Sequence, residues 1–208
     1  MSFKEDFILN AIKDKDVLDI GSGGDLVYLK EHADVNELLV YKMRKIAKSL
    51  TLVEIDRHAS DKLKSLGFTV YNDNAEIIKI NNTFDVIVMG DVIEHVDNIG
   101  LLIKNMKSHL RKDGKIIITT PNPFSFNNFF RILTFRKPNI QFDHTSFIEP
   151  NNLVEICKRN GLKLEELHYY TLTDKRSVAL HVGSCILKIV GSIYQHFNLY
   201  WLAVLKKE

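Results

Sequence analysis

A short run near the N-terminus has the residue types of a ligand-binding turn. Asp19 lies in the apolar segment Val17–Ile20, and Gly21, Ser22 and Gly23 follow it directly. Glycine lets the backbone approach a ligand and offer its N–H groups, because no Cβ stands in the way. Glycines alone would also suit a tight turn between a strand and a helix. A carboxylate at the end of a central strand, however, is costly to bury without a positive partner, so Asp19 predicts a ligand with a cationic group.

A second acidic residue ends the next apolar run. Glu54 and Ile55 close the segment Thr51–Ile55. A carboxylate at this position can accept two hydrogen bonds from ribose hydroxyls. We therefore predict that Glu54 binds a ribose, whereas Asp56 is expected to cap the helix that follows.

Polar residues also follow the third run, Phe68–Tyr71. Asn74 and Ala75 come three and four residues after it. A side-chain amide here could accept from an adenine amino group, and the neighbouring backbone N–H could meet a ring nitrogen. Taken alone, this segment is only a polar turn.

The fourth run, Phe84–Met89, is followed by three ionisable side chains within five residues: Asp91, Glu94 and His95. They would lie at the carboxyl edge of a parallel sheet, where open α/β proteins bind ligands. The alternative is that Glu94 and His95 open the next helix and have only a structural role.

The segments that must position these side chains alternate between short β-rich runs and helix-length stretches. Most of the runs are continuously apolar, as in parallel strands that are covered on both faces. The expected strands are Val17–Ile20, Thr51–Ile55, Phe68–Tyr71, Phe84–Met89, Lys115–Thr120, Lys163–Tyr170 and Leu199–Leu205. Helices are expected at Asn151–Asn160, ended by Gly161, and at Ser177–His196. The pattern predicts an α/β fold with a doubly wound, seven-stranded, mostly parallel sheet.

Together these segments resemble the class I S-adenosylmethionine-dependent methyltransferases over nearly the whole chain. Asp19–Gly23 is similar to the first motif of that family, Glu54 to its ribose-binding acid, and Asn74–Glu76 to a segment that usually reads Asp-Ala-Glu. The stretch Phe84–His95 resembles its fourth-strand signature. The resemblance implies a Rossmann-like methyltransferase fold with the last strand antiparallel, and S-adenosylmethionine as the cofactor. It implies cofactor-binding roles for Asp19, Gly21, Ser22, Gly23, Glu54, Ile55, Asn74, Ala75 and Asp91.

The acceptor side carries a more specific resemblance. The segment His144–Leu164 is similar to one that is common in methyltransferases encoded among surface-polysaccharide biosynthesis genes. This implies a small or glycan-like acceptor, and we expect methylation of an oxygen atom.

Three features depart from the family pattern. Asp25 stands where the third motif glycine is usual, and Asn74 replaces the common Asp, so it would accept from adenine without a charge. The stretch between Gly21 and Glu54 is longer than typical. We therefore expect Tyr28–Ser49 to hold an extra helix near the cofactor entrance.

Two other functions fit the glycine turn less well. A nicotinamide-binding protein would need a third glycine in the pattern G-x-G-x-x-G, which Gly21–Leu26 lacks. Asp19 also suits a sulfonium amino acid better than a pyrophosphate. The second alternative is a catalytically silent protein of the same fold that regulates a partner; a lack of cofactor binding would favour it.

An aromatic and basic segment precedes the last third of the chain. Six of the twelve phenylalanines lie between Phe124 and Phe142, together with Arg131, Arg136 and Lys137. The segment is either a packed connector or a lid in which these three basic side chains bind a phosphate or pyrophosphate of the substrate. The helix at Ser177–His196 is expected to pack on the domain, although contact with a membrane interface stays open.

Methyl transfer rests mainly on holding the acceptor in line with an already activated donor. An oxygen acceptor also loses a proton, and imidazole is largely free base at pH 7. His144 and His95 are therefore the candidate bases, with His144 preferred because Asp143 beside it would set its tautomer. His95 is expected at a helix start. Asp91 and Glu94 would orient such a base, the alternative being that they bind a divalent ion; we predict no metal site.

Composition limits the remaining classes. With 208 residues the chain fits one domain, 1–208, with a cofactor half at about 1–120 and an acceptor half at about 121–208. A net charge of +2 is too balanced for a nucleic-acid-binding protein. The two cysteines favour a reducing cytoplasm, and no uncharged apolar run reaches the roughly 18 residues that a membrane span needs. The oligomeric state is not predicted.

Overall fold

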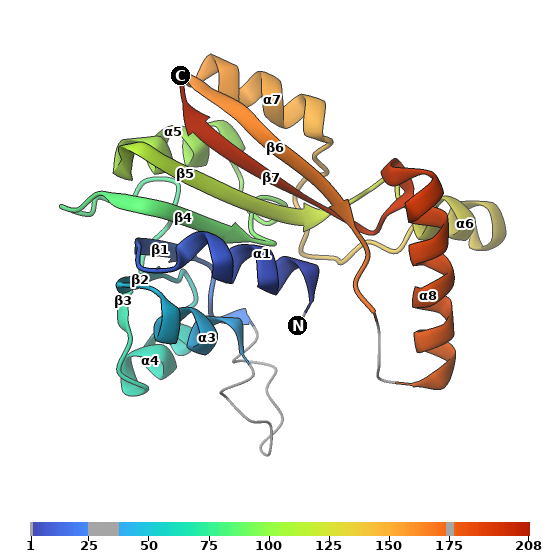
Figure 1. Ribbon diagram of the computed structural model, residues 1–208, viewed down its shortest axis with the longest axis horizontal. Coiled ribbons are helices and arrows are strands. Elements are labelled where there is room, and N and C mark those ends of the chain that lie inside the picture. The colour runs from blue at the N-terminus through green and yellow to red at the C-terminus, as the bar shows by residue number, and fades with distance from the viewer. Residues whose placement is uncertain (1, 25–37, 174–176) are drawn as a thin grey trace.

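The computed structural model describes residues 2–24, 38–173 and 177–208. Seven strands form one sheet in the order β3-β2-β1-β4-β5-β7-β6 (Figure 1). They are β1 (Asp16–Ile20), β2 (Ser49–Val53), β3 (Thr69–Tyr71), β4 (Phe84–Gly90), β5 (Leu110–Pro121), β6 (Leu162–Tyr170) and β7 (Tyr200–Lys207). The first five strands pair in parallel, whereas β7 is antiparallel to both β5 and β6. The predicted seven-stranded methyltransferase-type sheet with an antiparallel last strand is confirmed.

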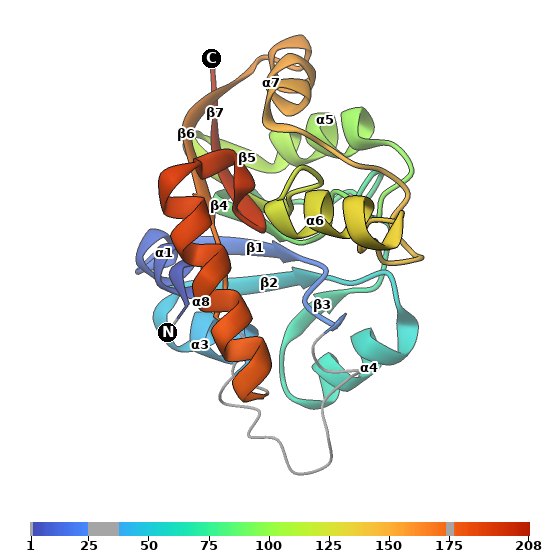
Figure 2. The ribbon, with the colours of Figure 1, turned by 90° about the vertical axis from the view of Figure 1, so that its right-hand side faces the viewer.

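Helices cover both faces of this sheet. One face carries α1 (Phe3–Ile12), α3 (Leu39–Ile46) and α4 (Arg57–Ser65), and the other carries α5 (Ile99–His109) and α7 (Pro150–Arg159). Two more helices, α6 (Phe126–Phe135) and α8 (Val178–Ile193), lie beyond the carboxyl ends of β4 and β5 (Figure 1). Figure 2 looks at the molecule from that end, with α6 and α8 in front of the sheet. Among the described residues, no helix is long and apolar enough to cross a membrane.

The apolar strand runs are explained by burial on two sides. Along β4, Val86 and Val88 pack in the cluster that contains α1, whereas Ile87 and Met89 pack in the cluster that contains α5. Successive side chains of a strand point to opposite faces, so a central strand under two helical layers needs apolar residues at every position. This is why the central strands read as continuous apolar runs.

The start of α5 differs from the sequence-based expectation. The helix begins at Ile99, and the Asn98 side chain caps it by accepting a hydrogen bond from the Leu101 N–H at 2.9 Å. Glu94 and His95 lie in a turn before it. The expectation that these two residues open the helix is therefore wrong, because Asn98 supplies the cap four residues later.

The structure also bears on the expectations for three segments between the strands. The helix expected at Tyr28–Ser49 lies partly outside the described residues. The part of this stretch that is described begins at residue 38 and contains α3. The segment from Phe124 to Phe142, predicted to be a packed connector or a lid, contains α6, which Ser125 caps. The helix expected at Asn151–Asn160 is confirmed as α7, and Gly161 after it has a φ of +66°.

Candidate active site

A cleft of about 960 Å³ opens at the carboxyl ends of β1, β2 and β4. Parallel strands bring these ends to one edge of the sheet, so residues that are distant in sequence meet there. All nine residues that were predicted to bind the cofactor line this cleft: Asp19, Gly21, Ser22, Gly23, Glu54, Ile55, Asn74, Ala75 and Asp91.

The turn after β1 requires glycine for two separate reasons. Gly21 has a φ of +77°, in the left-handed region, and a Cβ there would lie 2.8 Å from Cγ2 of Val92. Its N–H donates to the Val53 carbonyl at 2.9 Å, which ties the turn to β2. At Gly23 a Cβ would overlap the Glu54 carboxylate. The backbone can pass this close to the end of β2 only without side chains.

The Glu54 side chain joins the turn after β1 to the segment that follows β2. Its side chain is 6% exposed, and its two carboxylate oxygens accept from the backbone N–H groups of Gly23, at 2.8 Å, and Asp56, at 2.9 Å. Each oxygen keeps a further lone pair that ribose hydroxyls could use. Asp56 itself caps α4 by accepting from the Ala59 N–H at 2.7 Å, as predicted.

Asp19 is a buried carboxylate on the cleft wall. Burial raises its pKa to about 7, although a hydrogen bond from the Ser22 hydroxyl and the charge of Lys4 oppose the increase. The negative charge of Glu54 adds to it. Among the described residues, no lysine or arginine forms an ion pair with Asp19. A ligand ammonium would supply that partner.

Asn74 and Ala75, which are predicted to contact adenine, follow β3 and lie at the end of the cleft that is far from β4. Asn72 donates to the Glu54 and Ile55 carbonyls at 2.8 and 3.0 Å, which joins the ends of β2 and β3. The Asn74 side-chain oxygen accepts from the Glu76 N–H at 2.8 Å and shapes the turn that carries Ala75. Ile55 is 70% exposed and lines the cleft with its apolar surface. An exposed isoleucine at this place offers a flat apolar surface to a planar base.

Asp91 directly follows β4 and has an unusual backbone conformation, with a φ of +57°. One of its carboxylate oxygens accepts from Lys4 Nζ at 2.6 Å, and the other accepts from the Thr119 hydroxyl at 2.8 Å. Lys4 comes from α1 and also lines the cleft. Sequence reasoning missed Lys4 because nothing in the local pattern of an amphipathic N-terminal helix marks one lysine as a cleft residue.

Glu94, in the turn that follows β4, is a buried ionisable residue. Its side chain is 3% exposed, and one oxygen accepts from the Thr120 hydroxyl at 2.8 Å. The other oxygen, Oε1, is buried and has no hydrogen-bond partner among the described residues. Burial, and then the charge of Asp91, raises the pKa of Glu94 to about 7.

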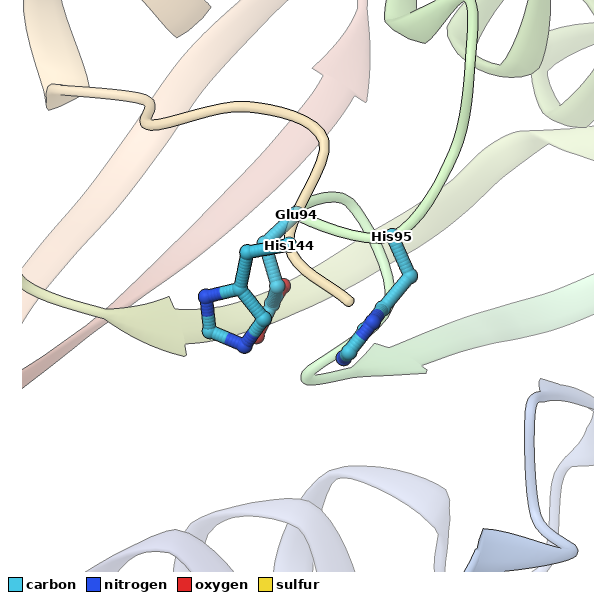
Figure 3. A group of neighbouring side chains, drawn as sticks. All are labelled: Glu94, His95 and His144. Carbon is cyan, nitrogen blue, oxygen red and sulfur yellow. The ribbon is translucent and has the colours of Figure 1, made fainter. Parts of the chain in front are cut away.

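The loop after α6 brings His144 to His95. The backbone N–H and the hydroxyl of Thr145 both donate to the Glu94 carbonyl, at 2.8 and 3.1 Å. This places the His95 and His144 rings at right angles with their centroids 4.8 Å apart, and the Glu94 carboxylate lies close to the His144 ring (Figure 3). Burial, and then the neighbouring His95, holds the pKa of His144 below its ordinary value of 6.5.

Asp143 was expected to orient His144, but it contacts His95 instead. Its carboxylate Oδ2 lies 3.5 Å from Nδ1 of His95, and its carbonyl oxygen lies 3.3 Å from the same nitrogen. Asp143 and His95 line the cleft, whereas His144 is not among the lining residues. The carboxylate–imidazole pair of the site is therefore Asp143–His95, because the loop turns Asp143 back towards the turn after β4.

The same cluster has the composition of a metal site. One ligand atom each from Glu94, His95 and His144 lie within 4.8 Å of one another, and within the described ranges no other such group of His, Cys, Asp or Glu was found. One carboxylate with two imidazoles suits zinc, manganese or iron. The arrangement can thus accept a proton at an imidazole or hold a divalent cation.

The three basic residues that were predicted to bind substrate lie outside the cleft lining. The Arg131 guanidinium carbon lies 5.4 Å from the centre of the Phe135 ring, and Arg136 ends α6 with a left-handed φ of +57°. Lys137 follows it on the surface. Their role stays a prediction.

Comparison with known proteins decides the family. The model of a family described as "Methyltransferase domain" matches residues 3–167, well over half of the chain. The chain belongs to this methyltransferase family. The family prediction that was made from the sequence is therefore confirmed.

Two curated relatives extend the similarity. This methyltransferase domain is 29% identical over 161 residues to a ubiquinone biosynthesis O-methyltransferase of Pelagibacter ubique, covering 75% of this chain and 65% of the relative. It is 24% identical over 164 residues to the protein of that name from Rickettsia canadensis, covering 76% of this chain and 66% of the relative. The chain thus spans just under two thirds of the length of these relatives.

The fold agrees with solved methyltransferase structures. An S-adenosylmethionine-dependent methyltransferase from Archaeoglobus fulgidus superimposes with a TM-score of 0.63 at 18% identity. The superposition covers 99% of this chain and 91% of that one.

Proposed function

We propose that this methyltransferase domain transfers the methyl group of S-adenosylmethionine to an oxygen atom of a small or glycan-like acceptor. The observation that carries the proposal is the convergence of the nine predicted cofactor residues on one cleft. Its wall contains the buried carboxylate of Asp19, which has no ion-pair partner among the described residues. S-Adenosylmethionine supplies a methyl group that is already activated on a sulfonium, so the chain's task is binding and positioning.

The residues present suit each part of this cofactor. Asp19 would pair with the ammonium of its amino-acid portion, which offsets the cost of burying the carboxylate. Glu54 would accept from the ribose hydroxyls with its remaining lone pairs. The adenine would lie between Ile55 and the turn at Asn74–Ala75. Asp91, neutralised by Lys4, closes the cleft towards the acceptor side.

Oxygen as the methylated atom is supported by the two O-methyltransferase relatives and by the groups beside the cleft. A hydroxyl loses a proton when it is methylated, whereas the positioned donor needs no further activation. The imidazole of His95 faces the cleft, and Asp143 orients its other nitrogen. We therefore propose His95 as the proton acceptor and His144, whose ring packs at right angles to that of His95, as the second candidate.

The acceptor class rests on weaker support. The glycan-like acceptor comes from the sequence resemblance of His144–Leu164, and the basic residues Arg131, Arg136 and Lys137 suit an anionic portion that extends out of the cleft. We also propose a cytoplasmic location, supported by two free cysteines; burial raises the pKa of the Cys157 thiol to about 12.

The experiment that tests the function is a methyl-transfer assay with labelled S-adenosylmethionine. Purified protein is offered nucleotide sugars, lipid-linked sugars and polyprenylated phenols, and the labelled product is analysed for methyl ether. Transfer to one acceptor class is the expected result. Protein that is folded but binds no S-adenosylhomocysteine would contradict the proposal and favour the silent regulatory alternative.

A further inference from the structure

The helix α8 has its apolar side turned outward. Five residues at helical spacing form an exposed stripe, each between 51% and 82% exposed: Val178, Val182, Ile186, Ile189 and Ile193. The buried positions are small or polar instead. Ser184 is 5% exposed, and a Cβ at Gly191 would overlap the side chain of Asn198. This is the reverse of a surface helix, which normally buries its apolar stripe.

The neighbouring helix α6 has the same reversed arrangement. Its one buried side chain is that of Asn128, which donates to the Pro123 carbonyl at 3.1 Å and accepts from the Asn139 N–H at 3.0 Å. Its apolar side chains, between 49% and 66% exposed, are Phe129, Phe130, Ile132, Leu133 and Phe135. A polar residue thus anchors the helix, while the aromatic residues face away from the domain.

The two exposed faces are joined into one surface. Phe197, just after α8, contacts the rings of Phe126 and Phe129 of α6 at 5.7 and 6.3 Å, and that of Tyr194 at 5.8 Å. Figure 2 shows α6 and α8 side by side at the carboxyl end of the sheet. We call the exposed apolar residues of these two helices, with Tyr194, the α6–α8 surface. An apolar surface of this extent marks an interaction site.

The charge of the two segments that form the α6–α8 surface indicates the kind of partner that it binds. Residues 121–142 and 177–200 contain four basic residues, Arg131, Arg136, Lys137 and Lys188, and no aspartate or glutamate. The whole chain, in contrast, is nearly balanced at +2. If two copies of this surface faced each other, each copy would bring four basic side chains and no acidic one to the contact. An anionic layer with an apolar interior complements both properties at once.

We propose that the α6–α8 surface docks peripherally on an anionic phospholipid bilayer. The apolar side chains of α6 and α8 enter the interface between head groups and acyl chains, and the basic residues lie at the level of the lipid phosphates. Since the chain leads directly from α6 to Gln141 and Asp143 in the cleft lining, docking places the acceptor side of the cleft next to the bilayer. The consequence, which rests on the proposed function, is that the acceptor is an amphiphile whose hydroxyl-bearing head projects from a membrane.

The test is flotation of the purified chain with vesicles of phosphatidylcholine, with and without phosphatidylglycerol. We expect the protein to float with the vesicles that contain phosphatidylglycerol, and to bind less as the salt concentration rises. Ile186→Ser combined with Ile189→Ser should weaken this binding at least about tenfold, because it removes two apolar side chains from the middle of the stripe.

A matched control separates membrane contact from general surface apolarity. Ile77→Ser combined with Leu101→Ser changes two exposed apolar residues, 58% and 38% exposed, that lie outside α6 and α8, and should leave vesicle binding unchanged. Circular dichroism melting would verify that both double variants are folded. Equal vesicle binding by the Ile186/Ile189 variant and the wild type would overturn the proposal.

Two further outcomes would also overturn it. One is no flotation with either vesicle type. The other is a dimer in light scattering that the Ile186/Ile189 variant abolishes, without any vesicle binding, since the surface would then join two copies. S-Adenosylhomocysteine binding, measured in parallel by calorimetry, keeps the two proposals apart: its loss would contradict the proposed function and leave the membrane result standing.

Discussion

Lys4 of α1 and Asp91 at the end of β4 form an ion pair, with Nζ 2.6 Å from Oδ2, although 87 residues separate them in the chain. The pair places a positive charge in a cleft that Asp19 and Glu54 also line, and near the buried Glu94. The Lys4 charge lowers the pKa values of Asp19 and Glu94, both of which burial raises. Lys4 therefore helps to keep these carboxylates ionised near neutral pH.

Loss of Lys4 should accordingly weaken cofactor binding without any loss of a direct contact. We expect Lys4→Ala to lower the affinity for S-adenosylhomocysteine several-fold at pH 7, and the deficit to shrink at higher pH, where Asp19 ionises without help. Calorimetry at a series of pH values measures this. Lys13→Ala, at an exposed lysine just after α1, is the control; an equal effect of both variants would show that only overall charge matters.

Glu54 should prove essential for cofactor binding. We expect Glu54→Ala to weaken S-adenosylhomocysteine binding more than tenfold, above ~1.4 kcal/mol. The variant loses the ribose acceptor and also the bonds to the Gly23 and Asp56 N–H groups. A melting curve distinguishes a local loss from unfolding. Undiminished affinity in the folded variant would remove Glu54 from the ribose site.

The binding of cofactor should depend on the ionisation of Asp19. Its pKa of about 7 means that a proton must leave before the carboxylate can pair with a ligand ammonium. S-Adenosylhomocysteine affinity should therefore rise between about pH 6 and 8, and Asp19→Asn should weaken binding and remove this dependence. A flat pH profile in the wild type would contradict the assignment.

The same carboxylate should lower the stability of the ligand-free domain. In the unfolded chain Asp19 has its ordinary pKa of 3.8, and in the folded domain it binds its proton more tightly. Its contribution to folding is thus fully present below the unfolded pKa and is lost as the pH rises through about 7. Asp19→Asn should raise the melting temperature at pH 8 while it weakens cofactor binding. A lower melting temperature would show that the Ser22 hydrogen bond outweighs the cost of the buried charge.

The histidines should separate in a turnover assay. We expect His95→Ala to cut methyl transfer about 100-fold or more, the low end for loss of a general base, with cofactor affinity near that of the wild type. His144→Ala should have a smaller effect, because His144 is not among the residues that line the cleft. His58→Ala, on α4, is the control. The opposite order would restore the assignment that the sequence favoured, in which His144 is the base.

Chelation distinguishes a histidine base from a metal-bound cluster. If an imidazole accepts the proton, protein that is dialysed against EDTA should keep its full rate of methyl transfer. Loss of activity that one divalent ion restores, together with weaker binding of that ion by Glu94→Gln, would show that Glu94, His95 and His144 work as metal ligands.

Much of this protein could be predicted from its sequence, because the determining interactions are local. Continuous apolar runs follow from burial of a parallel sheet on both faces, so the positions of the strands along the chain were predictable. The glycine turn follows from a close backbone approach that only Gly21 and Gly23 allow. Since parallel strands share one carboxyl edge, the convergence of Asp19, Glu54 and Asp91 also follows from the strand pattern.

The tertiary structure decided what depends on loops and distant contacts. The hydrogen bonds that the Thr145 N–H and hydroxyl donate to the Glu94 carbonyl turn Asp143 towards His95, and no local pattern of residues 143–145 encodes that direction. Lys4 reaches Asp91 because α1 packs across the sheet, a contact between segments 87 residues apart. The sequence likewise shows apolar periodicity in α8, but periodicity does not say which way a helix faces. Packing at Ser184 and Gly191 turns the apolar stripe outward, because only the small side of the helix can approach the domain closely.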